Sequence, residues 1–363
     1  MSGRRLSIAI LTAVVLKVSG QPLFGHSEEW ADGWQFVLAD DSTYALPHCD
    51  DSHWRTVSVP HDWGVELPMS PDAGSCQGYR HGGCAWYRRH FRADGLPTGQ
   101  ARRLFVCFEG VYNRSTVYLN GHLLGHRPSG FATFLYDLTP HLLRDSDNVL
   151  AVRVDHSREN DCRWYTGSGI NRRVWAVTSG DVHFAPWATR WRIVSLDSRR
   201  ARVEVTLETA DERPSADAGW QAQCDVEIRD GRQKVVARGS VGIGPSDRRS
   251  LVLTVSHPRQ WSPDDPHLYY IYARAKQGDT VADSTCVPLG LRQTAFSPDK
   301  GFALNGRPMK MKGVCLHDDA GVLGTAVPRE VWSRRLVRLK QLGVNAVRMS
   351  HNPHQPLLYD LCD

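Results

Sequence analysis

The chain has 363 residues, of which 41% are hydrophobic and 23% are charged. This length predicts two or three domains with cores of ordinary size, and the composition excludes a disordered or fibrous protein. The 44 basic and 39 acidic residues are interspersed, without the basic run that nucleic-acid binders concentrate, so we expect no nucleic-acid partner.

Residues 1–20 have the pattern of a secretory signal peptide. Arg4 and Arg5 precede an apolar run from Leu6 to Leu16, and small residues follow at Ser19 and Gly20. The apolar run is too short to span a bilayer as a helix, and the rest of the sequence contains no other membrane segment. We therefore expect a secreted or periplasmic protein with no membrane partner.

Nine cysteines are spread along the chain, with no CxxC pair and no Cys/His array at zinc spacing. We therefore predict no metal site and no cofactor, and we expect most of the cysteines to be buried apolar thiols. One or two disulfides stay open if the protein is exported, and Cys76 and Cys84 are the pair nearest in sequence.

Two all-β regions follow the signal. In the first, strand composition at 104–108, 115–119 and 149–154, with a hairpin turn at Asn120-Gly121, predicts a β-sandwich or jelly roll. In the second, alternation at 203–207, 224–228 and 251–255 predicts another sandwich of roughly 100 residues. The second region shows no residues that suggest chemistry.

The last region changes from alternating strands to an α/β pattern. After a small hairpin at Asn305-Gly306, the sequence predicts a strand over 309–317, a helix that opens at Pro328, and a strand over 344–349. We expect both strands to be buried on both faces. The helix carries one apolar face, formed by Trp332, Leu336, Leu339 and Leu342. The three elements form a right-handed βαβ unit with parallel strands.

A cluster of polar residues follows each predicted strand. His317-Asp318-Asp319 follows the first, and Ser350-His351-Asn352 follows the second. The carboxyl ends of parallel strands meet at one edge, where (β/α)₈ barrels place their chemistry. The alternative is that these are ordinary loop residues that cap a helix or face water.

The first β region adds candidates of its own. Trp63, Trp86, Trp164 and Tyr165 have rings that could line a ligand cleft, although a Trp in a β-sandwich also serves as core filling. The charged candidates Asp62, Asp161 and Arg163 are expected in loops, where the alternative role is to brace a turn.

Several stretches resemble glycoside hydrolase family 2, which includes β-galactosidases, β-glucuronidases and β-mannosidases. The segments GVCLHDDAGVLG, VPREVW, LKQLGVNAVRMSHNP and LYDLCD resemble the opening of its catalytic barrel. PHDW, CAWYRRHF, FEGVYNRSTVYLNGHLLGHRPSGFATFLYDLTP and RWYTGSGINRRVW resemble its N-terminal sugar-binding jelly roll, and WSPDDPHLY resembles a segment of its immunoglobulin-like second domain. The likeness is greatest to the bacterial β-galactosidase branch.

The resemblance implies a multidomain, mainly β protein. Its parts are a jelly-roll sugar-binding domain over 21–183, an immunoglobulin-like β-sandwich over 184–290, and the first βαβ unit of an incomplete (β/α)₈ TIM barrel over 291–363. It also implies a carbohydrate substrate and a homo-oligomer in the full-length form.

The resemblance further implies roles for residues at the barrel edge. His317 and His351 would contact the sugar, Arg348 would keep the nucleophile ionised, and Asp318 and Asn352 would flank the pocket. The family cleaves β-glycosides with retention by two glutamates, the first in an Asn-Glu pair, and this sequence contains no such pair.

We therefore expect a β-galactosidase-like chain cut short early in the barrel, without either catalytic glutamate and inactive alone. The alternatives are a member that acts on β-glucuronides or β-mannosides, or a non-catalytic protein whose β-modules bind carbohydrate.

Overall fold

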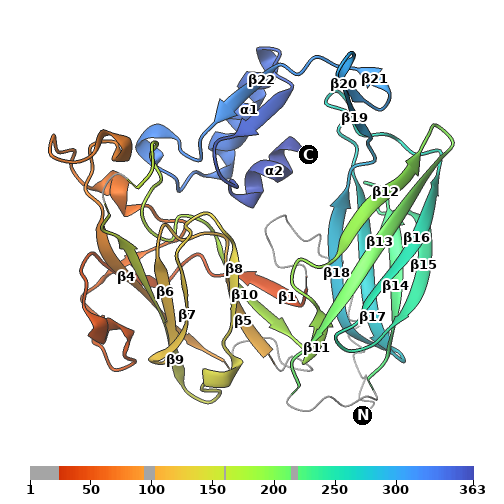
Figure 1. The fold of residues 1–363 in the computed structure, drawn as a ribbon. Helices are drawn as coiled ribbons and strands as arrows, with labels where there is room; N and C mark the ends of the chain where they lie inside the picture. The colour runs from red at the N-terminus through yellow and green to blue at the C-terminus, as the bar shows by residue number, and fades with distance from the viewer. Residues whose placement is uncertain (1–23, 94–102, 159–160, 214–219) are drawn as a thin grey trace, which may run out of the picture.

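The computed structural model describes residues 24–93, 103–158, 161–213 and 220–363, so the predicted signal peptide lies outside the described residues. Two β domains stand side by side, and a smaller α/β unit formed by the C-terminal residues lies above the first of them (Figure 1). No helix in the described ranges is long and apolar enough to cross a membrane.

The first domain is a sandwich of two antiparallel sheets. The larger has the order β3 (Arg55–Val57), β2 (Trp34–Val37), β4 (Gly83–Arg92), β9 (Asp147–His156), β6 (Ser115–Leu119) and β7 (His122–Arg127). The smaller has the order β1 (His26–Glu29), β10 (Val174–Ser179), β5 (Arg103–Phe108) and β8 (Phe134–Asp137). Short 3₁₀ helices lie at Ser42–Ala45, Trp63–Glu66, Ser75–Gln77 and Thr139–His141.

The local signals read from the first domain are confirmed. Strands occupy the three predicted stretches, and the β6–β7 turn has positive φ at Asn120 (51°) and Gly121 (83°). Positive φ at two successive residues is what a type I′ hairpin turn requires.

The second domain is the predicted immunoglobulin-like sandwich. One sheet joins β11 (Val182–Phe184), β13 (Arg200–Asp211), β12 (Arg190–Leu196) and β16 (Arg248–Ser256). The other has the order β15 (Val235–Ile243), β14 (Ala222–Arg229), β17 (Tyr269–Gln277) and β18 (Thr280–Leu289). Alternate residues of β13 point inward, since Ala201, Val203, Val205 and Leu207 are all fully buried.

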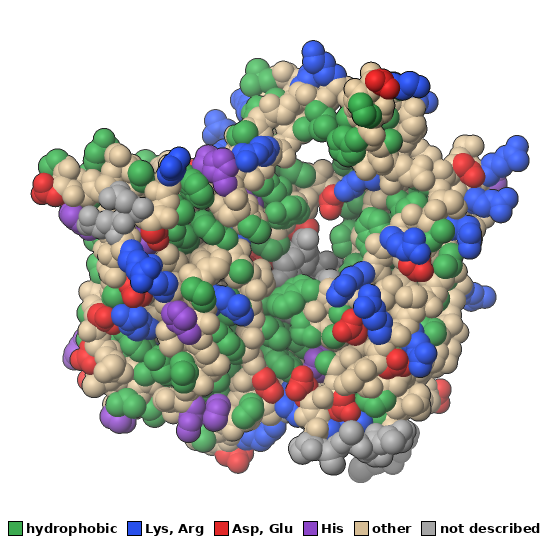
Figure 2. Space-filling model, viewed as in Figure 1, with side chains coloured by type: hydrophobic (Ala, Val, Ile, Leu, Met, Phe, Trp, Pro, Cys, Tyr) green, Lys and Arg blue, Asp and Glu red, His purple; other side chains and the backbone are tan. Residues whose placement is uncertain are grey.

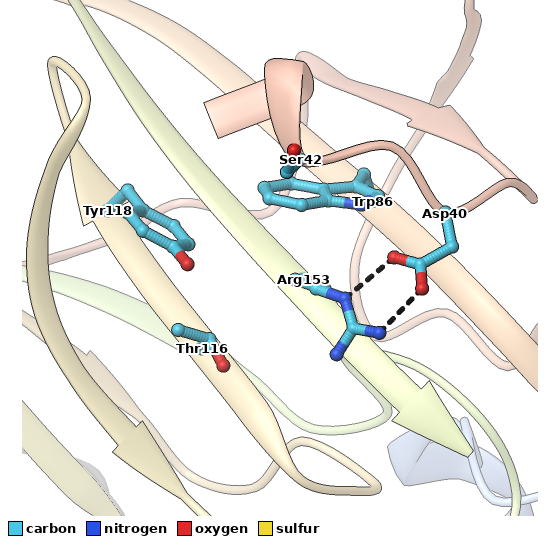
Figure 3. Close-up of a pocket in the computed structure, with 6 residues that line it drawn as sticks. All are labelled: Asp40, Ser42, Trp86, Thr116, Tyr118 and Arg153. Carbon is cyan, nitrogen blue, oxygen red and sulfur yellow. Dashed lines mark hydrogen bonds and ion pairs between the residues drawn. The ribbon is translucent and has the colours of Figure 1, made fainter. Parts of the chain in front are cut away.

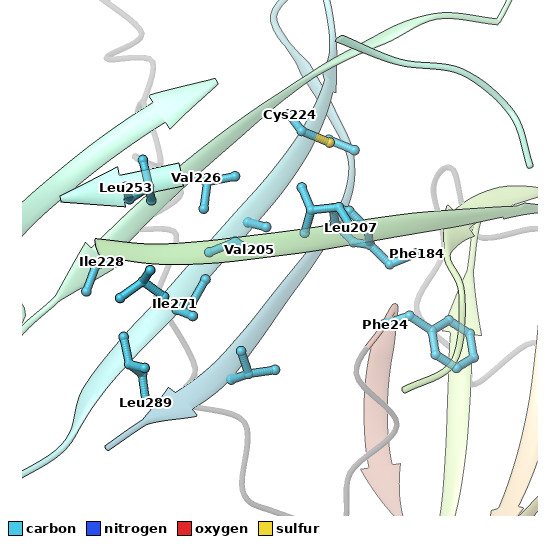
Figure 4. Close-up of a cluster of buried hydrophobic side chains, with 14 of the residues drawn as sticks. Phe24, Phe184, Val205, Leu207, Cys224, Val226, Ile228, Leu253, Ile271 and Leu289 are labelled. Atoms are coloured by element: carbon cyan, nitrogen blue, oxygen red, sulfur yellow. The ribbon is translucent and has the colours of Figure 1, made fainter. Parts of the chain in front are cut away.

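The two β domains share part of one hydrophobic core. Phe24, Phe105 and Trp175 of the first domain belong to the same buried cluster as Phe184 and Leu207 of the second. Figure 4 shows Phe24 and Phe184 at the side of this cluster that faces the first domain. The first domain is therefore packed against the second through apolar contact.

The C-terminal region begins with a ribbon of β19 (Thr294–Ser297), β20 (Gly301–Leu304) and β21 (Arg307–Pro308). Then β22 (Gly313–Leu316) and β23 (Ala346–Met349) pair in parallel, joined by the 3₁₀ turn Gly321–Leu323 and by α1 (Arg329–Gln341), and α2 (Pro356–Cys362) follows. This is the predicted βαβ unit.

The strands of this unit differ from the prediction in burial. Gly313, Cys315 and Arg348 are exposed, because the two-stranded sheet is covered on one face only. The expectation that both strands are buried on both faces is therefore wrong, and each strand is shorter than predicted. The helix begins at Arg329, with Pro328 as its N-cap.

The cysteines also differ from expectation. All nine are free thiols, and only Cys107, Cys224 and Cys286 are buried, so the expectation that most would be buried is wrong. Acidic and basic side chains are interspersed over the face of the molecule seen in Figure 2.

Candidate functional site

The parallel register places the two polar clusters side by side. Leu316 of β22 lies opposite Met349 of β23, so His317 and Ser350 follow the two strands at the same edge. The Ser350 N–H donates to the carbonyl of Leu316, at 2.9 Å, which ties the two strand ends together.

A loop of the first domain covers this edge and brings an aromatic ring to both histidines. The ring centroid of Trp164 lies 5.6 Å from that of His317 and 4.9 Å from that of His351. The two imidazoles are 5.3 Å apart and nearly perpendicular, at 78°. Three predicted site residues from three distant segments therefore form one cluster, here called the ring cluster (Trp164, His317 and His351).

Arg348 adjoins the ring cluster and selects the tautomer of one imidazole. Its guanidinium donates to Ser350 Oγ at 2.8 Å and contacts His351 Nδ1 at 3.2 Å. Because a guanidinium has no acceptor, Nδ1 must accept, and the proton of a neutral His351 then sits on Nε2. Hydrogen bonds from Ser350 and Arg348 also lower the pKa of the exposed Cys315 thiol.

Asp318 is buried, at 7% exposure, and its carboxylate joins the α/β unit to the first domain. Arg172 donates to Asp318 Oδ2 at 2.7 Å and to the carbonyl of Pro353 at 2.7 Å. His354 Nδ1 lies 4.0 Å from the other carboxylate oxygen. Since the carboxylate is already engaged by Arg172, Asp318 acts as a brace behind the ring cluster.

Asp62 is a second buried brace between the same two parts. Its carboxylate accepts from the Tyr165 hydroxyl and from the N–H groups of Gly64 and Ser168, at 2.9–3.0 Å. It also accepts from the N–H and the hydroxyl of Thr325, at 2.9 and 3.2 Å. Five donors occupy its acceptor positions, so Asp62 positions the loop rather than contacting a sugar.

Two glycines allow this close approach. A Cβ added at Gly324 would lie 2.2 Å from Asp62 Oδ2, and one added at Gly167 would lie 1.9 Å from Thr325 Oγ1. Both also have positive φ, at 58° and 72°. Glycine is therefore required at both positions on steric and conformational grounds.

Of the remaining predicted residues, Asp161 holds its own loop in place and Arg163 lies at the surface. Asp161 accepts from Gln77 at 3.1 Å, Tyr112 at 3.2 Å and Asn113 at 2.8 Å, which holds its loop in place. Burial alone would raise the pKa of Asp161, but His156, Asn113 and Tyr112 hold it below the usual value. Arg163 is exposed beside Trp164.

Asn352 lies next to the ring cluster. Its Nδ2 donates to the Pro353 carbonyl at 3.1 Å, and its buried Oδ1 has no hydrogen-bond partner. Buried acceptors are normally satisfied, so this atom is available to a donor that enters the site.

Sequence reasoning did not single out Arg172, Thr325 or His354. Arg172 lies within the quoted stretch RWYTGSGINRRVW, and only its partner across the interface, Asp318, shows its role. Of the proposed sugar-stacking rings, Trp63 and Trp86 are each 1% exposed, as the core-filling alternative expects. Among the described residues, no group of three or more His, Cys, Asp or Glu side chains could hold a metal ion.

Two β domains precede the start of a parallel α/β barrel, and a loop of the first domain reaches the carboxyl edge of its strands. Models of protein families match the same three parts. "Glycosyl hydrolases family 2, TIM barrel domain" matches residues 298–363, "Glycosyl hydrolases family 2" matches 188–292, and "Beta-galactosidase second all-beta domain" matches 39–160. The chain belongs to glycoside hydrolase family 2.

Individual relatives agree with the family models. The chain is 38% identical over 336 residues to beta-galactosidase BoGH2A of Bacteroides ovatus, which covers 91% of this chain and 39% of that protein. It is 26% identical to a beta-glucuronidase of Bacteroides fragilis, with 90% of this chain and 48% of that protein covered. A solved family 2 member from Bacteroides cellulosilyticus superposes with a TM-score of 0.87 at 32% identity, over 93% of this chain and 44% of the other. The chain thus spans less than half the length of each of these proteins.

Proposed function

We propose that this chain is part of a glycosidase that hydrolyses the O-glycosyl bonds of β-galactosides with retention of configuration. The observation that carries the proposal is the ring cluster, in which Trp164, His317 and His351 meet at the carboxyl edge of the parallel strands. An indole face suits the C–H-rich face of a pyranose, and imidazole groups suit its hydroxyls. Ligand pockets combine apolar walls with a few such polar groups.

Each residue at the edge has a distinct role in this proposal. Trp164 stacks on the sugar, and His317 and His351 hold its hydroxyls, with the His351 Nε2–H as a donor. Arg348, next to His351, keeps the nucleophilic carboxylate ionised through its positive charge. Asn352 accepts a hydrogen bond from a sugar hydroxyl at its unpartnered Oδ1. Asp318, Asp62 and Asp161 hold the surrounding loops in position.

A β-galactoside is favoured because the relative at 38% identity is named a beta-galactosidase. A β-glucuronide is the second candidate, since another relative is named a beta-glucuronidase and the exposed Arg163 beside Trp164 could pair with a sugar carboxylate. No observation singles out β-mannosides.

Retaining hydrolysis needs two carboxyl groups about 5–5.5 Å apart. The family's acid/base glutamate follows an asparagine, and no Asn-Glu pair occurs in these 363 residues. We therefore propose that neither catalytic carboxylate belongs to this chain and that the chain alone does not turn over substrate.

The test is turnover of a chromogenic β-galactoside, with the β-glucuronide and β-mannoside analogues alongside. The 363-residue chain is compared with one extended by the reading frame after codon 363. Activity in the extended chain alone supports the proposal. Activity in the 363-residue chain would place the carboxylates within it, and inactivity of both on all three substrates would favour a non-catalytic carbohydrate-binding protein.

A variant locates the activity at the ring cluster. In the active extended chain, Trp164→Ala is expected to lower kcat/KM by at least about tenfold through loss of sugar stacking, equivalent to about 1.4 kcal/mol. Trp187→Ala is the matched control, because Trp187 is 38% exposed in the second domain. Equal losses in the two variants would contradict the assignment.

Three further expectations accompany this proposal. They are the domain limits 21–183, 184–290 and 291–363, export directed by residues 1–20, and a homo-oligomer of the full-length protein. Sequencing the amino terminus of the exported protein checks the second, with Gln21 expected as the first residue.

A further inference from the structure

The outer face of the six-stranded sheet carries a pocket separate from the ring cluster. Its volume is about 380 Å³, which lies in the range of small-molecule sites. Asp40, Ser42, Trp86, Thr116, Tyr118 and Arg153 line it (Figure 3).

The pairing of the strands explains why these side chains meet. Arg153 of β9 lies opposite both Trp86 of β4 and Thr116 of β6, so the three side chains form one row on one face. In the next row Ala151 lies opposite Tyr118, and the small side chain of Ala151 leaves a hollow in this face of the sheet. The segment between β2 and β3 brings Asp40 and Ser42 over the side of the hollow.

Two stacked rings form the aromatic part of the pocket. Trp86 is 1% exposed, and the Tyr118 ring stacks on it with centroids 5.9 Å apart and planes 24° apart. Tyr118 itself is only partly buried. In Figure 3 the hydroxyl groups of Tyr118 and Thr116 both point to the side on which Arg153 lies. The wall therefore offers apolar ring surface with hydroxyl groups at its rim.

The charged part of the pocket is internally balanced. Arg153 donates to both oxygens of Asp40, each at 2.7 Å, and lies 3.6 Å from Asp155, which itself pairs with Arg114 at 3.2 Å. The hydrogen bond from Arg153 holds the pKa of Asp40 below its usual value, so both partners are ionised at neutral pH. Two positive and two negative groups leave no net charge to attract an ion.

We propose that this pocket binds one neutral pyranose unit, as a second carbohydrate site apart from the ring cluster. A pyranose has an apolar face for Tyr118 and hydroxyls for Asp40, Ser42 and Thr116. A uronic acid is disfavoured, because its carboxylate would meet Asp40 while Arg153 is already paired. The inference concerns binding only and holds whether or not the protein hydrolyses the sugar.

The two sites are structurally connected. Arg153 and His156 lie on the same strand, β9, and His156 Nδ1 lies 2.7 Å from Ser168 Oγ in the loop that carries Trp164. A carbohydrate chain held at the pocket would thus be anchored on the domain that supplies Trp164 to the ring cluster.

The experiment measures lactose binding to the 363-residue chain by calorimetry and by NMR. Trp164→Ala first removes binding at the ring cluster, and in that background Tyr118→Ala and Thr116→Val test the pocket. Residual binding in Trp164→Ala is expected to weaken about tenfold on Tyr118→Ala and several-fold on Thr116→Val, which deletes one hydroxyl without changing the shape. Leu123→Ala is the control, because Leu123 is 60% exposed on β7 of the same sheet, and it should change nothing.

Thermal unfolding of each variant separates lost binding from lost folding. The proposal is overturned if Trp164→Ala abolishes all lactose binding, if lactose does not bind at all, or if neither pocket variant changes the residual affinity. Phenyl β-glucuronide should bind the pocket more weakly than phenyl β-galactoside, and the reverse order would overturn its assignment to a neutral sugar.

Discussion

The β domains and the C-terminal α/β unit are held by different forces. The sandwiches bury long rows of apolar side chains, whereas the buried hydrophobic cluster of the α/β unit has four members, Val327, Trp332, Leu357 and Leu358. The unit also exposes Val322 at 89% and Leu342 at 81%. Buried polar groups, above all Arg172–Asp318 and Asp62–Thr325, connect the unit to the first domain.

This difference separates what makes the fold from what makes the site. Apolar burial is non-directional and tolerates small shifts, whereas a buried ion pair defines both distance and orientation. The ring cluster lies where the two parts meet, so its geometry depends on the polar braces. Weakening a brace should therefore loosen the α/β unit and leave the sandwiches intact.

The largest effect is expected from Arg172→Met. The Arg172 and Asp318 side chains are 2% and 9% exposed, so the substitution leaves a buried carboxylate unpaired. Removing one partner of a buried pair typically destabilises by about 3–5 kcal/mol. Hydrogen exchange should accelerate in α1 by the corresponding factor, with β14 of the second domain unchanged.

Arg192→Met provides the matched control. Arg192 also pairs with a carboxylate, Glu204, but its side chain is 66% exposed. Water screens an exposed pair, which therefore contributes little to stability, so this variant should leave exchange in α1 unaltered. Equal destabilisation by both variants would mean that the Arg172–Asp318 pair does not hold the junction.

A smaller effect is expected from Gly324→Ala, compared with Gly321→Ala. Both glycines have positive φ, 58° and 59°, so alanine is strained at both, and the ψ of −139° at Gly324 lies outside the left-handed α region and adds to the strain there. A Cβ at Gly324 would meet Asp62 at 2.2 Å, whereas one at Gly321 has nothing within 4 Å. Gly324→Ala should therefore be less stable by about 1–3 kcal/mol beyond the shared strain, measured by denaturant unfolding.

If the two alanine variants are equally stable, Asp62 moves freely and is not a brace. If Gly324→Ala also accelerates hydrogen exchange in α1 while β14 keeps its protection, the Asp62 brace holds the α/β unit independently of the sandwiches.

Local patterns in the sequence were sufficient to predict the architecture. Alternation in β13 and the Asn-Gly turns at Asn120 and Asn305 depend on neighbouring residues alone, and each was found where predicted. The burial of the parallel strands was predicted wrongly. It depends on which elements cover the two-stranded sheet rather than on the sequence of the strands themselves.

Trp164, His317 and His351 lie together at the carboxyl edge of the parallel strands, and their contacts with a sugar stay predictions. Asp62 and Asp318 instead form braces with partners 263 and 146 residues away. No periodicity or turn signal reports a contact at such separations, so these buried contacts could be recognised only in three dimensions.

The smallest predicted effect is a pH dependence of the same junction. Burial lowers the pKa of His354 below its usual value; nearby Asp318 opposes this, and Arg172 and His317 add to it. A histidine with a lowered folded-state pKa takes up its proton more readily when unfolded, so stability is present above about pH 6.5 and is lost as pH falls below it. One proton limits the slope to about 1.4 kcal/mol per pH unit. Exchange in α2, corrected for its intrinsic pH dependence, should therefore accelerate on acidification, and His354→Gln should flatten the response. Protection that rises as pH falls would mean that Asp318 stabilises a charged His354, and the junction would then be strongest in acid.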